Sequence, residues 1–85
     1  MLLSEAIKIR ITNLIEEKNK SSRYELSCEA GLNPSTLNDF YRGKIAYPRI
    51  DTLYLICDSF GITLEEFFSD DIFSRNNIEV EKDQK

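Results

Sequence analysis

The stretch SRYELSCEAGLNPSTLNDFYRGKIAYPR, residues 22–49, decides the fold of this chain. Its first part carries the signals of a short helix. Ser22 and Glu25 stand three residues apart, which is the capping-box pattern of a helix N-terminus. Gly31 follows where the chain must adopt a positive φ to leave a helix. These signals predict a helix over about residues 22–30.

The second part of the stretch predicts another short helix after a tight turn. Asn33 is a good N-cap, and Pro34 is a favoured first helical residue. Gly43 ends the pattern, so this helix is expected over about residues 33–42. Two short helices joined by a tight turn with glycine can hold the second helix away from the body, as insertion into a DNA major groove requires.

Three further helices are predicted on either side of this pair. Apolar residues recur at helical spacing over residues 4–19, with Ser4 as the expected N-cap, and again over residues 50–60. A second capping box at Thr63 predicts a short fifth helix. The chain is therefore expected to be all-α.

The C-terminal end carries weaker signals. Residues 1–73 are expected to form the domain, and residues 74–85 a polar, flexible tail. Within that tail, residues 78–81 alternate as a short strand would. Ile72 and Phe73 are apolar and follow the last clear helix, so they either cap the core or form a dimer seam.

The composition excludes most other classes of protein. The 85 residues fit one small domain, and a hydrophobic content of 41% suffices for one core. No His or Trp is present, and Cys28 and Cys57 stand far apart, so catalysis, a metal site, a cofactor and a disulfide framework are not expected. Isolated thiols suit a reducing cytosol, and no apolar run reaches the length of a signal peptide or membrane span. A cytoplasmic protein without enzymatic activity, small-molecule ligand or membrane contact is expected.

The net charge of −4 is distributed unevenly along the chain. Residues 1–50 hold eight basic and six acidic side chains, a balance of +2, whereas residues 51–85 hold three basic and nine acidic ones, a balance of −6. Phosphate contacts come from Lys and Arg, so the first part is the part suited to a polyanion. The acidic part is expected to face away from it.

The outward face of the helix over residues 33–42 follows from a rotation of about 100° per residue. With Leu37 set toward the core, Thr36 lies at the margin of the opposite face. That face carries short hydrogen-bonding groups and one cation, which suit base edges and phosphates. The residues on it are Ser35, Asn38, Asp39 and Arg42.

Groups suited to phosphate surround this face. Arg23 belongs to the first turn of its helix, where free N–H groups and the positive dipole end favour an anion. Arg42 and Lys44 flank Gly43, where the backbone can approach a phosphate closely. Arg49 opens the next helix in a similar way.

A set of positions within this framework resembles one family in order and spacing. They are Leu26, Ala30, Gly31, Leu32, Asn33, Leu37, Gly43, Lys44, Pro48, Leu53, Ile56, Cys57 and Phe67. The sequence is similar to the phage-repressor and Cro-type helix-turn-helix family, often called Xre regulators. The resemblance runs from about residue 7 to residue 68 and is most specific from Leu26 to Leu53.

The resemblance implies a compact five-helix, lambda-repressor-like DNA-binding domain. The helix over residues 33–42 would enter the major groove, and the helix over residues 22–30 would span the backbone above it. Carried over by position, base contacts are implied for Ser35, Thr36, Asn38 and Asp39. Phosphate contacts are implied for Ser22, Arg23, Arg42, Gly43, Lys44 and Arg49.

The sequence departs from the family pattern at several positions. Arg23 replaces the usual Gln, which should strengthen phosphate contact, and Pro34 stands where some members place a base-reading side chain. Tyr41 replaces the acidic residue at the end of the reading helix. Its usual arginine partner on the first helix has become Ile15 or Glu16. The packing of the first helix is therefore the less predictable part.

Two functions follow as hypotheses. The first is a sequence-specific transcriptional regulator, a repressor, that binds double-stranded DNA as a homodimer on a short inverted repeat. The second is a protein-interaction module of the same fold, antitoxin-like or an anti-repressor, with weak DNA binding. The acidic total and the carboxylate of Asp39 on the reading face favour the second. Tyr24 and Tyr47 either pack on the sugar-phosphate backbone or cover the edge of the core.

Overall fold

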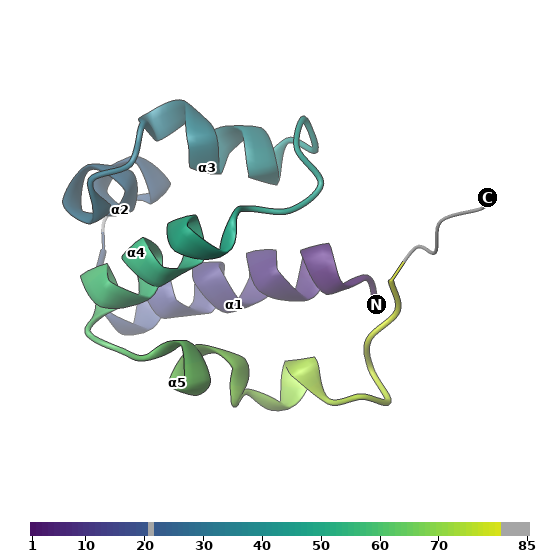
Figure 1. Ribbon diagram of the computed structural model, residues 1–85. Coiled ribbons are helices and arrows are strands. Elements are labelled where there is room, and N and C mark those ends of the chain that lie inside the picture. Colours follow the sequence, from purple (N-terminus) through teal and green to yellow (C-terminus); the bar gives the residue numbers. More distant parts are fainter. Residues whose placement is uncertain (21, 81–85) are drawn as a thin grey trace.

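Helix α1 (Leu3–Glu17) crosses the middle of the molecule, with other elements on two sides of it (Figure 1). The structure is a computed structural model that describes residues 1–20 and 22–80. The pair α2 and α3 lies at one side, α5 and the short 3-10 helix η1 lie at the other, and α4 lies beside α1 between them. The bounds of these elements are α2 Arg23–Ala30, α3 Pro34–Tyr41, α4 Ile50–Phe60, α5 Leu64–Phe68 and η1 Asp71–Phe73.

The helix ends follow the local signals for α2 to α5. The side-chain oxygen of Ser22 accepts a hydrogen bond from the Glu25 N–H at 3.1 Å, which caps α2 as expected. Thr63 and Glu66 form the reciprocal bonds of a capping box, both at 3.0 Å, and open α5. Gly61 adopts a φ of 77° and ends α4. The predicted all-α architecture with five helices is confirmed.

Both predicted ends of α1 are wrong by one or two residues. Leu2 is the N-cap instead of Ser4, because the Glu5 carboxylate accepts a hydrogen bond from the Leu2 N–H at 3.3 Å. The helix ends at Glu17, before the expected residue 19, because Asn19 adopts a left-handed φ of 57°. A short polar side chain tolerates this conformation, which turns the chain toward α2.

The core is built from every α-helix. The buried side chains alternate with exposed ones at the helical period, as predicted, and Leu32 in the turn packs against them. Cys57 lies in this core as a free thiol, and burial raises its pKa to about 11. The core side chains are Ile7, Ile11, Leu14, Leu26, Leu37, Phe40, Leu53, Ile56, Cys57, Phe60 and Phe67.

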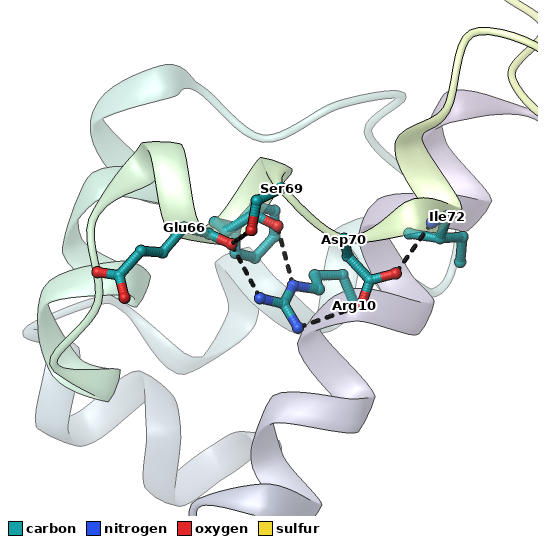
Figure 2. Close-up of polar contacts among 6 residues, drawn as sticks. Arg10, Glu66, Ser69, Asp70 and Ile72 are labelled. Carbon is teal, nitrogen blue, oxygen red and sulfur yellow. Dashed lines mark hydrogen bonds and ion pairs between the residues drawn. The ribbon is translucent and has the colours of Figure 1, made fainter.

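Arg10 on α1 contacts Glu66 and Asp70 (Figure 2), on the other side of α1 from α3 (Figure 1). Its side chain is only 12% exposed, and its guanidinium donates to the main-chain carbonyls of Phe67 at 2.9 Å and Glu66 at 3.0 Å. A third contact joins it to the Asp70 carboxylate at 3.4 Å. These bonds hold α5 and the start of η1 against α1, so this cation is not available to a polyanion.

The segment after η1 returns to the N-terminus (Figure 1). Leu3 N–H donates to the Glu79 carbonyl at 3.0 Å, and Glu79 N–H donates to the Met1 carbonyl at 2.8 Å. The expected strand over residues 78–81 takes the form of an isolated parallel bridge between Leu2 and Glu79. The first part of the predicted flexible tail thus makes backbone hydrogen bonds at Ser74, Asn77 and Glu79. Its residues 81–85 lie outside the described part of the chain.

Ile72 and Phe73 belong to η1 and are half-buried. The Phe73 ring is 4.9 Å from the Phe68 ring and 5.9 Å from the Phe67 ring, centroid to centroid. Phe73 is therefore packed against the core of its own chain.

Within residues 1–20 and 22–80, no helix is long and apolar enough to cross a membrane.

Candidate nucleic-acid interface

The turn between α2 and α3 sets which side of α3 faces solvent. Gly31 ends α2 at a φ of 76°, and Asn33 caps α3 by accepting a hydrogen bond from the Ser35 N–H at 3.0 Å. Leu37 and Phe40 are almost fully buried under α3. The opposite side of the helix therefore points away from the core, in the direction predicted from the sequence.

The four residues expected to face base edges differ in exposure. Ser35 and Asn38 are exposed, whereas Thr36 and Asp39 are half-buried. The Ser35 hydroxyl donates a hydrogen bond to Asn33 Oδ1 at 2.9 Å. Because its proton is engaged there, this hydroxyl can only accept from a further partner.

A shallow hollow lies between the N-terminal ends of α2 and α3. It brings predicted phosphate-binding and base-reading residues onto one surface. Tyr24 borders it and is 67% exposed, so the interpretation that Tyr24 covers the core edge is wrong. The lining residues are Ser22, Arg23, Tyr24, Pro34, Ser35 and Asn38.

The loop after α3 uses its backbone donors to close the helix. Gly43 has a φ of 81° and donates its N–H to the Phe40 carbonyl at 3.2 Å. Lys44 N–H donates to the Asp39 carbonyl at 2.9 Å. Nothing lies within 4 Å of the place where a Cβ would stand on Gly43. Close approach at this glycine thus depends on the missing side chain, and the charge must come from the exposed side chains of Arg42 and Lys44.

Arg49 stands at the N-cap of α4, close to an acid. Its Nε lies 3.2 Å from Asp51 Oδ1, and both side chains are well exposed to water. An ion pair with this exposure is weak and is screened by salt. Arg49 therefore remains accessible to a phosphate, although Asp51 offsets part of its charge.

Tyr41 connects the end of α3 to two other helices, which sequence reasoning missed. Its hydroxyl donates to the Lys8 carbonyl at 3.0 Å and lies 3.0 Å from Thr12 Oγ1, both on α1. The Arg23 guanidinium carbon lies 4.1 Å from the centre of its ring. Burial raises the pKa of Tyr41, while the Thr12 hydrogen bond and the Arg23 charge oppose that shift. The helical wheel places Tyr41 beside the core direction, but it does not give these partners.

Lys8 is a further cation that the sequence did not single out. It is half-buried on α1, with its Nζ 5.3 Å from the centre of the Phe40 ring. It lines a hollow together with Gly43 and Tyr47 of the loop between α3 and α4. The N-terminal half of α1 thus adds positive charge beside the predicted phosphate loop.

We also searched the structure for reactive cysteines and for metal-binding groups. Cys28 and Cys57 are free, one exposed and the other buried. In the described part of the chain, no group of three or more His, Cys, Asp or Glu side chains is arranged to hold a metal ion.

The two short helices, the glycine turn and the polar outer face of α3 define a helix-turn-helix DNA-binding protein. A family model described as a Cro/C1-type HTH DNA-binding domain matches residues 10–71, which is most of the chain. The chain belongs to this family of non-enzymatic DNA-binding domains, and its five-helix fold is consistent with the lambda-repressor-like fold. No curated protein and no solved structure matches the chain.

Proposed function

We propose that the protein is a sequence-specific transcriptional regulator, a repressor, that reads a short inverted repeat with α3 in the major groove. The observation that carries this proposal is the exposed polar face of α3, with Ser35 and Asn38 at its centre and the cations Arg23 and Arg42 near it. Membership of a DNA-binding family supports the class of ligand.

Base reading would fall to Ser35, Thr36, Asn38 and Asp39. Ser35 has its proton engaged by Asn33, and the carboxylate of Asp39 is an acceptor, so both offer acceptors to the DNA. In the major groove the donors are the amino groups of adenine N6 and cytosine N4. We infer that the half-site presents adenine or cytosine opposite Ser35 and Asp39.

Phosphate binding would fall to side chains around that face. Ser22 already accepts the Glu25 N–H, which leaves its hydroxyl proton to donate to a phosphate oxygen. Gly43 permits close approach, because no side chain intervenes there. The charged contacts would come from Arg23, Arg42, Lys44 and Arg49.

We infer that the protein acts as a homodimer, because one unit of this size makes few base contacts and a palindrome supplies twice as many. The exposed apolar side chains of α4 form the surface that we propose as the dimer interface. Ile50 is 65% and Tyr54 56% exposed, and Tyr54 borders a hollow with Ile62 and Leu64. Replacing Tyr54 with Glu should leave a folded monomer in sedimentation and abolish cooperative binding to two half-sites. A variant that stays dimeric would exclude this surface.

We propose that the protein acts in the cytoplasm, because a regulator must share a compartment with its DNA. Two thiols that are not paired with each other are compatible with a reducing compartment.

Selection of bound sequences from random DNA tests the proposal directly. An enriched inverted repeat, bound with an affinity that falls steeply as salt rises, would support it. Arg42→Ala should weaken binding to all sequences alike, whereas the matched control Glu65→Ala on the distant α5 should leave binding unchanged. Absence of any enriched sequence would exclude sequence-specific regulation by this protein.

A second candidate function is a protein-interaction module of the same fold. The acidic C-terminal part and Asp39 beside the reading face favour it, because carboxylates repel phosphates. This candidate predicts a flat salt response and no enriched sequence in the same experiment.

A further inference from the structure

We propose that Tyr41 is a positioning residue for DNA binding, which holds the Arg23 guanidinium ready for a phosphate while anchoring the end of α3 to α1. This inference rests on the proposed DNA-binding function. It assigns a role to a series of side-chain contacts that links α1 through Tyr41 to Arg23 at the N-terminus of α2.

The hydroxyl of Tyr41 forms the anchored end of that chain. It donates to the Lys8 carbonyl at 3.0 Å and lies 3.0 Å from the Thr12 hydroxyl, which can donate to it. The two partners stand one helical turn apart on α1. Two bonds to one rigid helix fix both the position and the tilt of the phenol ring, which is itself half-buried.

The ring of Tyr41 forms the other end, where it meets Arg23. The guanidinium carbon lies 4.1 Å from the ring centre, which is well within the range of a cation–π contact. A guanidinium that rests on an aromatic ring by its planar face keeps its N–H edges free. Those edges are the groups that bind a phosphate in a bidentate manner.

Electrostatics explain why Arg23 needs such a partner. It is the first residue of α2, and the N-terminal end of a helix carries a partial positive charge that repels a cation. Without the ring, the long side chain would sample many rotamers in water. The ring attracts the guanidinium and restricts it, so less conformational entropy is lost when a phosphate binds.

The position of this contact links it to base reading as well. Tyr41 is the last residue of α3, and Arg23 borders the hollow that also contains Ser35 and Asn38. A brace at this place holds α2 and α3 in one relative orientation. Phosphate contact by Arg23 would therefore set the register of the α3 side chains against the bases.

A double-mutant cycle on the full chain tests the inference. The variants are Tyr41→Leu, which removes ring and hydroxyl, Arg23→Met, which removes the charge but keeps the stem, and the double variant. Affinity for the selected operator is measured at several salt concentrations, at a temperature where melting curves show each variant folded. Tyr41→Leu should weaken binding about fivefold, the size of a surface cation–π contact. Arg23→Met should weaken it more and lower the salt slope by about one.

The double variant gives the decisive comparison. It should bind no more weakly than Arg23→Met alone, because Tyr41 acts on DNA through Arg23. Tyr41→Phe keeps the ring and should bind DNA nearly as well as the original protein, while its melting temperature falls through loss of the hydroxyl bonds. A merely structural role for Tyr41 predicts that affinity follows melting temperature in all variants.

Phe68→Leu is the matched control, because it shortens an aromatic side chain on α5, away from α3. It should lower stability without changing affinity or salt slope. If Tyr41→Leu weakens binding equally with Arg23 present or replaced, the inference is overturned while DNA binding stands. If the original protein enriches no sequence and binds no DNA, the proposed function fails, and the inference with it.

Discussion

The paired helices α2 and α3 and the paired chain ends show two ways in which this sequence specifies structure. In the helix pair, the bonds that set the boundaries join residues two to five apart, as between Ser22 and Glu25. At the chain ends, the bonds join Leu3 to Glu79, more than seventy residues away. The first region lies inside the family match, whereas both chain ends lie outside residues 10–71. The pair α2 and α3 is thus specified by local bonds. The rest of the fold, which we call the framework, depends on long-range contacts such as those of Leu3 and Arg10.

The largest expected effect comes from breaking the framework at Arg10. Arg10→Met removes the charged hydrogen bonds to the Phe67 and Glu66 carbonyls and the ion pair with Asp70, and should lower the free energy of unfolding by about 3 kcal/mol. Urea denaturation measures this loss, with the exposed Arg75→Met as control. DNA affinity should change little wherever the variant is folded, because Arg10 lies on the other side of α1 from α3. A parallel loss of affinity would show that the two regions are coupled.

The same contrast explains how far the sequence could predict this protein. Caps and glycines act within one helical turn, so α2, α3 and the outward direction of Ser35 and Asn38 could be predicted from spacing alone. Arg10 and Tyr41 could not, because a helical wheel gives a direction but not the partner that another helix supplies. Arg10 bonds to residues 56 to 60 positions away, and in the sequence it counts simply as one more positive charge.

Substitutions on the outer face of α3 should change the base preference of the protein. Ser35→Ala or Asp39→Ala should change which bases are preferred, at a cost of about 1–3 kcal/mol for the original operator. Lys44→Ala should instead weaken all sequences alike and lower the salt slope by about one. Competition binding with operator variants separates the two patterns. If Lys44→Ala altered base preference, its assignment to phosphate would be wrong.

A smaller effect is expected at the cap of α2. Ser22→Ala removes the acceptor for the Glu25 N–H and should lower stability by about 1 kcal/mol. Ser74→Ala is the control, since Ser74 is exposed beyond η1, and its effect should stay within about 0.5 kcal/mol. Thermal melting measures both. Equal effects at the two sites would contradict the view that α2 depends on its local cap.

The effect that is smallest at neutral pH concerns Cys57 and develops only in alkaline solution. Cys57 lies in α4 beneath α2, and burial raises its pKa from 9.0 to about 11, while the charge of Arg10 opposes the shift. The folded state therefore holds this proton more tightly than the unfolded state. The resulting stability is fully present below pH 9 and is lost as the pH rises to about 11. Cys57→Ala should remove this part of the pH dependence in urea titrations, whereas Cys28→Ala on the exposed side of α2 should not. Arg10→Met should make the alkaline loss of stability larger, since the Cys57 thiolate would then lack its nearby cation. An unchanged pH profile in this variant would show that the charge of Arg10 does not act on Cys57.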